Sequence, residues 1–234
     1  MGTLYLVRHG QASAFEENYD RLSPLGERQA RLLGEWWARR GPKLDRVFTG
    51  PRVRQQRTAE LAAEAGGLPR PLALPELDEM GIEPLFKEHL PDLFTRHAHL
   101  QSLGDAMLMA DGDEGRARSL ARLFEAVLML WVRGEVSGDG VEPWLGFRAR
   151  VRKALSKVRE GARGQRIAAF TSAGPVAAAM QLALGFDDAT ALSLAFRVRN
   201  SSVSEFLFSD GDRFSAASFN ETPHLDDPTL MTVR

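Results

Sequence analysis

The 234-residue chain has 30 basic and 31 acidic side chains, and therefore a formal net charge of −1. This balance excludes a polybasic nucleic-acid-binding surface or an acidic tail as the dominant feature. The hydrophobic fraction of 44% is typical of a globular protein, and the length suits one domain, residues 1–234, that carries an insertion. Cysteine is absent, which excludes disulfides, thiolate metal sites and cysteine nucleophiles.

No segment has the pattern of a targeting signal or a membrane anchor. Residues 1–8 lack a basic leader, and their apolar run is too short for a signal peptide. The most apolar stretch, residues 123–132, is interrupted by Glu125 and has about half the length that a membrane span needs. We therefore expect a soluble, cytoplasmic protein with neither a membrane nor a nucleic acid as partner.

The first third of the chain alternates short β-rich runs with longer helical patterns. Ser23 suits the N-cap of a helix and Pro24 its first position, and Leu33 and Trp37 belong to its apolar stripe. In chain order the patterns predict a strand at 3–7, a helix from Ser23-Pro24 to Gly41, a strand at 46–49, a helix from Gly50-Pro51 to Gly66 and a short edge strand at 71–74.

Between about residues 80 and 140 the alternation stops. A loop-like region carrying His89, His97 and His99 is followed by a helix near residues 116–132. We interpret this stretch as a helical insertion that covers the functional site, since such additions often shape a substrate pocket.

The last third returns to the alternating pattern. It predicts a helix at 144–160, a strand at 166–171, an alanine-rich helix after Ser172-Ala173-Gly174-Pro175 that ends at Gly185, and a hairpin of strands 203–209 and 213–219 around Asp210-Gly211-Asp212. Strands that alternate with helices favour crossover connections. We therefore expect a three-layer α/β/α fold with a mostly parallel sheet of about six strands.

The tripeptide Arg8-His9-Gly10 directly follows the first predicted strand. Ligands of open α/β sheets bind at the carboxyl ends of the strands, so this position suits a site. Histidine is a competent nucleophile towards phosphorus, and arginine can clamp phosphate oxygens bidentately. Since only four of the 30 basic residues are lysine, a lone arginine in this chain is weak evidence of a site.

Further motifs occur along the chain in a definite order. They are residues 4–13 (LYLVRHGQAS), 22–30 (LSPLGERQA), 54–60 (RQQRTAE), 77–79 (LDE), 200–203 (NSSV), and, more weakly, Phe219-Asn220 with His224-Leu225. Together they resemble the histidine phosphatase superfamily, whose best-known members are the cofactor-dependent phosphoglycerate mutases. The resemblance spans nearly the whole chain, which makes it far more specific than any single motif.

The resemblance implies a role for each of four residues. His9 is the residue that becomes phosphorylated, and Arg8 and Arg54 hold the transferring phosphoryl group. Glu79 is the general acid that protonates the leaving group and then deprotonates the attacking water. The family chemistry needs no metal ion and no other cofactor.

Alternatives exist for two of these assignments. Only Arg54 has the family's spacing to Thr58-Ala59, and for Arg52 and Arg57 a solvated helix face is the better interpretation. The rivals of Glu79 are Glu76 and Glu83.

The chain departs from the family at Ala173, where a second histidine usually follows the strand. Its loss removes a donor that can stabilise a transition state by about 3 kcal/mol. Pro175 suits the first position of the following helix, so the amides of Ala173 and Gly174 are expected to face the phosphate. His97, His99 or His224 could also reach the pocket, although a surface or structural role is the better interpretation for each.

These observations predict a metal-independent phosphomonoester hydrolase that acts on a small phosphorylated metabolite through phosphohistidine. A mutase is less expected, because Gln11, Ala12 and Ser13 replace the residues that continue the mutase motif. A phosphoprotein phosphatase is an alternative within the enzyme class. The other alternative is a phosphate-binding or regulatory homologue with little turnover, which Ala173 favours. The oligomeric state cannot be inferred from the sequence.

Overall fold

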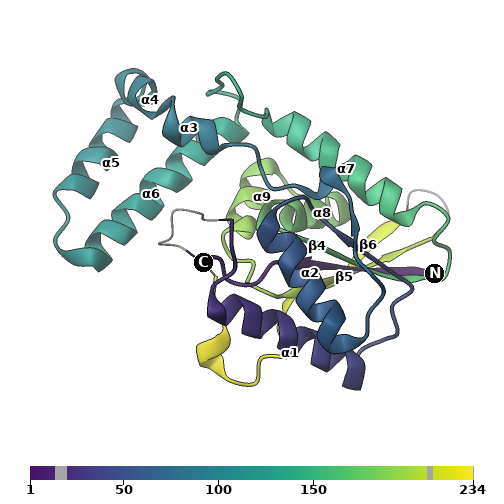
Figure 1. Ribbon diagram of the computed structural model, residues 1–234. Helices are drawn as coiled ribbons and strands as arrows, with labels where there is room; N and C mark the ends of the chain where they lie inside the picture. Colours follow the sequence, from purple (N-terminus) through teal and green to yellow (C-terminus); the bar gives the residue numbers. More distant parts are fainter. Residues whose placement is uncertain (14–19, 210–212, 234) are drawn as a thin grey trace. The chain divides into compact units, whose positions relative to one another are not determined.

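The structure, a computed structural model, describes residues 1–13, 20–209 and 213–233 (Figure 1). The predicted turn at Asp210-Gly211-Asp212 lies outside the described residues. The chain divides into two compact units, which are considered separately below. Met1–Glu79 together with Arg148–Arg234 form the sheet unit, and Met80–Phe147 form the helical unit.

The described residues of the sheet unit form one six-stranded sheet in the order β3-β2-β4-β1-β5-β6. The first four strands in this order pair in parallel, and β5 and β6 add an antiparallel edge. The strands are β1 (Gly2–Arg8), β2 (Arg46–Thr49), β3 (Leu72–Ala73), β4 (Arg166–Thr171), β5 (Val203–Phe208) and β6 (Phe214–Glu221). This arrangement confirms the predicted mostly parallel α/β fold.

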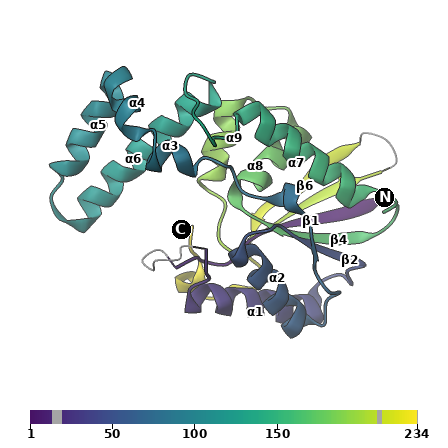
Figure 2. The same cartoon turned by 45° about the horizontal axis from the view of Figure 1, so that its top comes forward.

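Helices cover both faces of the sheet (Figures 1 and 2). The central strand β4 is buried at every position from Ile167 to Thr171, as expected for a parallel strand between two helical layers. Helices α1 (Pro24–Arg40) and α2 (Val53–Gly66) lie on one face, and α7 (Trp144–Arg159) and α8 (Ala173–Leu184) lie on the other (Figure 2). The shorter elements are η1 (Pro75–Leu77), α9 (Asp188–Ala195) and η2 (Pro228–Leu230).

The start of α1 agrees with the sequence signal. The Ser23 side chain accepts a hydrogen bond from the amide of Gly26, and Pro24 is the first helical residue. The buried positions of α1 recur at helical spacing, and they include Leu33 and Trp37.

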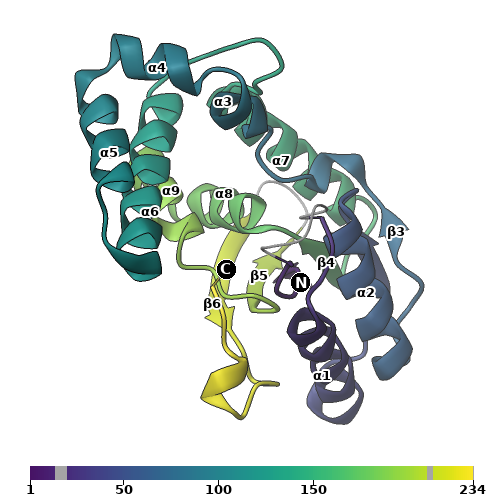
Figure 3. The same ribbon diagram turned by 60° about the vertical axis from the view of Figure 1, so that its left-hand side comes forward.

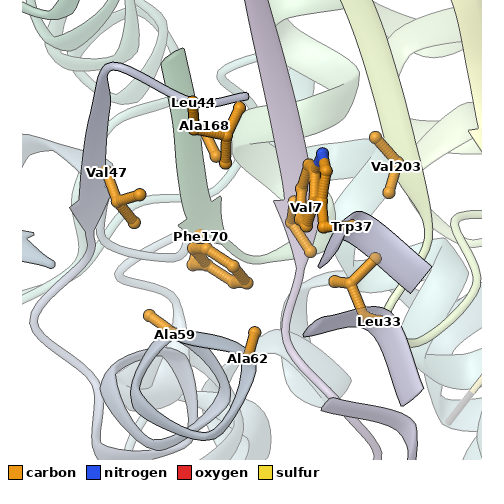
Figure 4. Packing of buried hydrophobic residues seen from close by; sticks show 10 residues of the cluster. All are labelled: Val7, Leu33, Trp37, Leu44, Val47, Ala59, Ala62, Ala168, Phe170 and Val203. Atoms are coloured by element: carbon orange, nitrogen blue, oxygen red, sulfur yellow. The ribbon is translucent and has the colours of Figure 1, made fainter. Parts of the chain in front are cut away.

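A core cluster lies between α1, α2 and the sheet (Figure 4). Trp37 from α1 packs against Phe170 of β4, with ring centroids 6.4 Å apart. Burying such large apolar side chains supplies most of the driving force for joining these two layers. The cluster comprises Val7, Leu33, Trp37, Leu44, Val47, Ala59, Ala62, Ala168, Phe170 and Val203.

The helical unit corrects one sequence prediction. The stretch carrying the three histidines is helical rather than loop-like, and the unit contains α3 (Glu83–Lys87), α4 (Leu90–Arg96), α5 (Ala98–Leu108) and α6 (Gly112–Val132) (Figure 3). The first two of these helices have five and seven residues. Helices this short show too few turns for an apolar period to be recognised.

The helical unit has an apolar interior of its own. Phe86 and Phe124 stack with ring centroids 4.6 Å apart, and the Trp131 and Trp144 rings meet edge to face at 5.2 Å. These contacts explain why short helices of little intrinsic stability are helical here, since packing rather than propensity supplies most helical stability.

In the C-terminal half of the chain, one prediction is wrong and one helix was not predicted. Helix α8 begins at Ala173, so Pro175 occupies the third helical position rather than the first. Helix α9 was not predicted, although Asp187 caps it by accepting a hydrogen bond from the Thr190 amide. The helix has only eight residues and a weak apolar period, so the Asp187 cap is its main recognisable sequence signal.

Helices α1 and α2 approach each other closely at a glycine. A Cβ atom on Gly34 would lie 2.3 Å from the carbonyl oxygen of Ala62, which is backbone and cannot rotate away. The crossing of the two helices that carry much of the core therefore requires a residue without a side chain at this position.

We predict that Gly34→Ala destabilises the protein by about 2 kcal/mol, because the two helices must separate. Helix propensity alone would give the opposite sign, a gain of about 0.5–1 kcal/mol. Urea unfolding followed by circular dichroism measures the change. Gly115→Ala in α6 is the matched control, since its Cβ would meet only Ala110 at an ordinary 3.6 Å. Equal stability of the two variants would contradict the prediction.

Candidate active site

The structure brings the Arg8-His9-Gly10 motif to the carboxyl end of β1, beside the end of β4. The amide of His9 donates to the carbonyl of Thr171, the last residue of β4, at 2.9 Å. Gly10 then packs directly on Gly26 of α1, where a Cβ on Gly10 would lie 2.4 Å from the Gly26 carbonyl oxygen. Gly10 and Gly26 belong to the first two motifs, and both are needed because the loop after β1 and the start of α1 lie too close together for a side chain.

The imidazole of His9 is buried, with 5% of the residue exposed. Its Nδ1 lies 2.7 Å from the carbonyl oxygen of Gly10, and its Nε2 accepts a hydrogen bond from Arg54 Nε at 3.1 Å. A guanidinium can only donate, so Nε2 carries a lone pair and Nδ1 carries the proton. These two contacts define the tautomer and direct Nε2 towards Arg54.

The surroundings of His9 disfavour its charged form. Burial lowers the pKa of the imidazole well below its usual value, and the charges of Arg54 and Arg8 lower that pKa further. The hydrogen bond to the Gly10 carbonyl acts in the opposite direction but is the smaller effect. At neutral pH the ring is therefore neutral, and the lone pair of Nε2 accepts the hydrogen bond from Arg54.

Arg54 lies in the first turn of α2, and its spacing to Thr58 has a structural reason. The Thr58 hydroxyl, one turn later, donates to the Arg54 carbonyl at 2.6 Å and accepts from the Gly10 amide at 3.0 Å. The four-residue spacing therefore places the arginine side chain at His9 while it ties α2 to the loop after β1.

Arg8 reaches towards the C-terminal segment. Its Nη1 donates to the carbonyl of Val233 at 2.6 Å and to the carbonyl of Val198. Its charge still contributes to the lowered pKa of His9. Both predicted arginines are therefore within electrostatic reach of the imidazole, and Arg54 also donates a hydrogen bond to it.

Glu79 meets the N-terminus of α8. Its carboxylate accepts from the Gly174 amide, at 3.2 Å for Oε1 and 3.5 Å for Oε2. The predicted acid and one of the predicted phosphate-binding amides are therefore in direct contact. Ala173, the other predicted amide position, is the first residue of the helix. The positive end of the helix dipole faces the carboxylate.

The segment before Glu79 is held by two arginines that the sequence analysis did not assign to the site. Arg150 of α7 donates to the carbonyls of Glu76, Asp78 and Glu79, the last at 2.9 Å. Arg52 donates from Nε to Asp78 Oδ1 at 2.6 Å, and the same oxygen accepts from the Glu79 amide.

This arrangement corrects the interpretation of Arg52 as a solvated helix residue. It precedes α2 and is only 26% exposed at its side chain, because it fixes the segment that carries Glu79. A lone arginine in an arginine-rich chain carried no signal of this role, and the same applies to Arg150. Arg57, by contrast, makes surface pairs with Glu27 and Glu60.

The rival glutamates lie elsewhere. Glu76 pairs with Lys157 at 2.5 Å and with Lys153 at 3.6 Å. Glu83 begins α3 in the helical unit. Glu79 is the glutamate whose carboxylate contacts the start of α8, directly after β4.

The Asn200-Ser201-Ser202 motif holds the backbone of His9. The Ser201 amide donates to the His9 carbonyl at 3.1 Å, and Asn200 Nδ2 donates to the same oxygen at 3.4 Å. Ser201 adopts a left-handed backbone conformation with φ of 55°. Such a conformation is uncommon for serine and persists only where surrounding contacts impose it.

His224 is one of these surrounding contacts. It is buried, and its Nε2 lies 2.8 Å from Ser201 Oγ. Burial lowers the pKa of His224 to about 4, so the ring is neutral at pH 7. Of the three additional histidines considered from the sequence, His224 therefore contributes to the site through Ser201. His97 and His99 flank the start of α5 in the helical unit.

Asp20 is a further contact of the site that the sequence gave no reason to expect. Its Oδ1 accepts from Arg54 Nη1 at 2.9 Å.

Within residues 1–13, 20–209 and 213–233, no group of three or more histidine, aspartate or glutamate side chains could hold a metal ion. In the same described part of the chain, no helix has the length and apolar character needed to cross a membrane.

Comparisons with known proteins bear on the family to which the chain belongs. The sequence profile of the histidine phosphatase superfamily (branch 1) matches residues 4–99 and 113–222. A 2,3-bisphosphoglycerate-dependent phosphoglycerate mutase from Caulobacter vibrioides is 42% identical over 71 residues. That match covers 28% of this chain and only 30% of the length of the mutase.

Solved structures share the fold over nearly the whole chain. The alpha-ribazole phosphatase from Shigella flexneri has a TM-score of 0.64 at 21% identity, covering 94% of this chain and 96% of the phosphatase. A phosphoglycerate mutase from Bacillus anthracis has a TM-score of 0.65 at 18% identity, covering 95% of this chain and 94% of the mutase. Because the superfamily profile spans most of the sequence, the chain belongs to the histidine phosphatase superfamily.

We predict that His224 makes the fold acid-sensitive. Its folded pKa of about 4 lies below the usual 6.5, so the unfolded chain binds a proton more readily. The stability contribution is complete above pH 6.5 and is lost as the pH falls towards 4, by about 2 kcal/mol at pH 4.5. Urea unfolding of wild type and His224→Gln at pH 7 and pH 4.5 tests this. The variant should lose less stability between the two pH values, and parallel losses would contradict the assignment.

Proposed function

We propose that the protein is a metal-independent phosphomonoester hydrolase that acts through a phosphohistidine at His9. The observation that carries this proposal is the hydrogen bond from Arg54 Nε to His9 Nε2, on a ring whose Nδ1 is bonded to Gly10. A neutral imidazole beside a buried guanidinium combines a nucleophile with the charge that a phosphoryl group requires.

In the first step, Arg54 Nε transfers its hydrogen bond from His9 Nε2 to a phosphoryl oxygen, and the freed lone pair of Nε2 attacks phosphorus in line with the departing oxygen. The N–P bond forms as the P–O bond breaks, and Glu79 in its protonated form donates a proton to the leaving alkoxide. Arg54, Arg8 and the Gly174 amide stabilise the negative charge on the phosphoryl oxygens. The contact of Glu79 with Gly174 supports this pairing, because the carboxylate and the amide lie together at the start of α8.

In the second step, water attacks the phosphohistidine. Glu79, now a carboxylate, accepts a proton from that water as the O–P bond forms. The N–P bond breaks, the lone pair returns to His9 Nε2, and inorganic phosphate leaves. Hydrogen bonds from the Ser201 amide and the Asn200 side chain to the His9 carbonyl hold His9 in position through both steps.

The proposed substrate is a small phosphorylated metabolite. The similar proteins are named as a phosphatase of alpha-ribazole and a mutase of phosphoglycerate, which are small molecules. We propose hydrolysis over mutase activity because Gln11, Ala12 and Ser13 stand where the mutase motif continues differently. Phosphoproteins are the alternative substrate class, which a substrate panel separates. The cytoplasm is the proposed location.

A second candidate function is phosphate binding with little turnover. Ala173 favours it, because a methyl group at the start of α8 replaces a side chain that could donate to the phosphoryl group. The two functions differ in whether bound phosphate ester is cleaved.

We predict that the wild type releases phosphate from para-nitrophenyl phosphate with or without a chelator, and that His9→Ala abolishes release. The loss should exceed about a thousandfold, because the substitution removes the nitrogen that accepts the phosphoryl group in the proposed mechanism. His99→Ala, which changes an exposed histidine of the helical unit, is the matched control and should keep wild-type activity.

Two results would overturn the hydrolase proposal. One is activity in His9→Ala, and the other is an inert wild type whose melting temperature still rises with phosphate, which would establish the binding function. Acid-labile phosphate on His9 in quenched turnover identifies the intermediate.

Glu79→Gln should slow the hydrolysis of alkyl phosphates more than that of aryl phosphates, because aryl leaving groups need less protonation.

We predict that Ala173→His raises the turnover number about tenfold, because a donor returns to the end of β4. Ala173→Leu is the control, since it adds comparable bulk without a donor. Steady-state kinetics of both variants with the same aryl phosphate measure the effect. If Ala173→His is no faster than Ala173→Leu, the site has been rebuilt around the small residue.

A further inference from the structure

The carboxylate of Asp20 binds the same part of the molecule that the proposed mechanism assigns to phosphate. Its Oδ2 accepts from the amide of Val53 at 2.9 Å, and its Oδ1 accepts from Arg54 Nη1 at 2.9 Å and lies 3.5 Å from the Arg54 amide. Val53 and Arg54 are the first two residues of α2. Asp20 therefore neutralises the start of this helix from a distant point in the sequence.

These contacts hold the Arg54 guanidinium at two places. Nε donates to the histidine and Nη1 donates to the aspartate, and the arginine side chain is only 7% exposed. A long side chain with many rotamers is thereby restricted to one orientation. Charge-assisted hydrogen bonds of this kind combine strength with directional control.

The negative charge of Asp20 also acts on any anion bound at Arg54. Its side chain is 29% exposed, so solvent reduces the interaction without abolishing it. A phosphate dianion is attracted by Arg54 and repelled by the carboxylate already paired with that arginine. This opposition weakens the retention of phosphate after hydrolysis.

We infer that Asp20 is a positioning residue that orients Arg54 towards His9 and, as its counter-ion, promotes release of inorganic phosphate. This inference rests on the proposed function for its kinetic part only. The binding part concerns the Asp20–Arg54 pair and inorganic phosphate, and it can be measured without turnover.

Two substitutions separate orientation from charge. Asp20→Asn keeps an oxygen that can accept from Arg54 but removes the charge, so phosphate should bind about threefold more tightly or better. Asp20→Ala removes both, so Arg54 loses its anchor and the turnover number should fall about tenfold with a smaller change in KM. Calorimetric titration with inorganic phosphate and product-inhibition kinetics with para-nitrophenyl phosphate give the two readouts.

Asp187→Asn is the matched control. Asp187 also caps a helix, accepting from the Thr190 amide at 2.7 Å, but no ion pair with an arginine is recorded for it among the described residues. It should leave phosphate affinity and turnover at wild-type values. A purely capping role for Asp20 predicts that all three variants lose only thermal stability, with phosphate affinity unchanged.

The outcomes distinguish this inference from the proposed function. If the wild type does not hydrolyse phosphate esters but Asp20→Asn binds phosphate more tightly, the function fails and the counter-ion role holds. If turnover is present and Asp20→Asn binds phosphate equally or more weakly, the inference is overturned. Absence of phosphate binding in both proteins also overturns it. Should Asp20→Ala not fold, the Asp20→Asn titration alone decides.

Discussion

The candidate site depends on one hydrogen bond between a buried imidazole and a buried guanidinium. Arg54 Nε donates to His9 Nε2, and this donor requires a lone pair on the ring. Burial and the neighbouring positive charges keep the ring neutral, as its lowered pKa indicates. The same contact therefore defines the tautomer, the protonation state and the position of positive charge beside Nε2. The proposed phosphohistidine mechanism requires all three together.

Much of the sheet unit can be understood as the means of maintaining this contact. His9 follows β1 and Arg54 belongs to α2, so two elements separated by α1 must meet at one edge of the sheet. Thr58 links them by accepting from the Gly10 amide. The absence of a side chain at Gly34 allows α1 and α2 to pack closely, and the Ser201 amide donates a hydrogen bond to the His9 carbonyl. These contacts are short and directional, so small displacements weaken them steeply.

Local signals predicted the elements of the sheet unit well. Ser23-Pro24 marked the start of α1, and all six strands were predicted to within about two residues. The prediction failed where the signal is not local. Helices α3 and α4 are too short to show a period, and packing within the helical unit stabilises them. Pro175 looked like a first helical residue but is the third, because α8 starts at Ala173 immediately after β4 and its Ser172 cap.

The sequence by itself determined the α/β class, the superfamily resemblance and the identity of His9, Arg8, Arg54 and Glu79 as candidates, because each belongs to a contiguous motif of residue types. Tertiary structure alone decided which side chains support them. Four supporting side chains contact partners that lie 23 to 74 residues away in the sequence: Asp20, Arg52, Arg150 and His224. Hydrogen bonds over such separations produce no recognisable pattern in the local sequence. They exist only because the sheet and its helices bring distant segments within about 3 Å of each other.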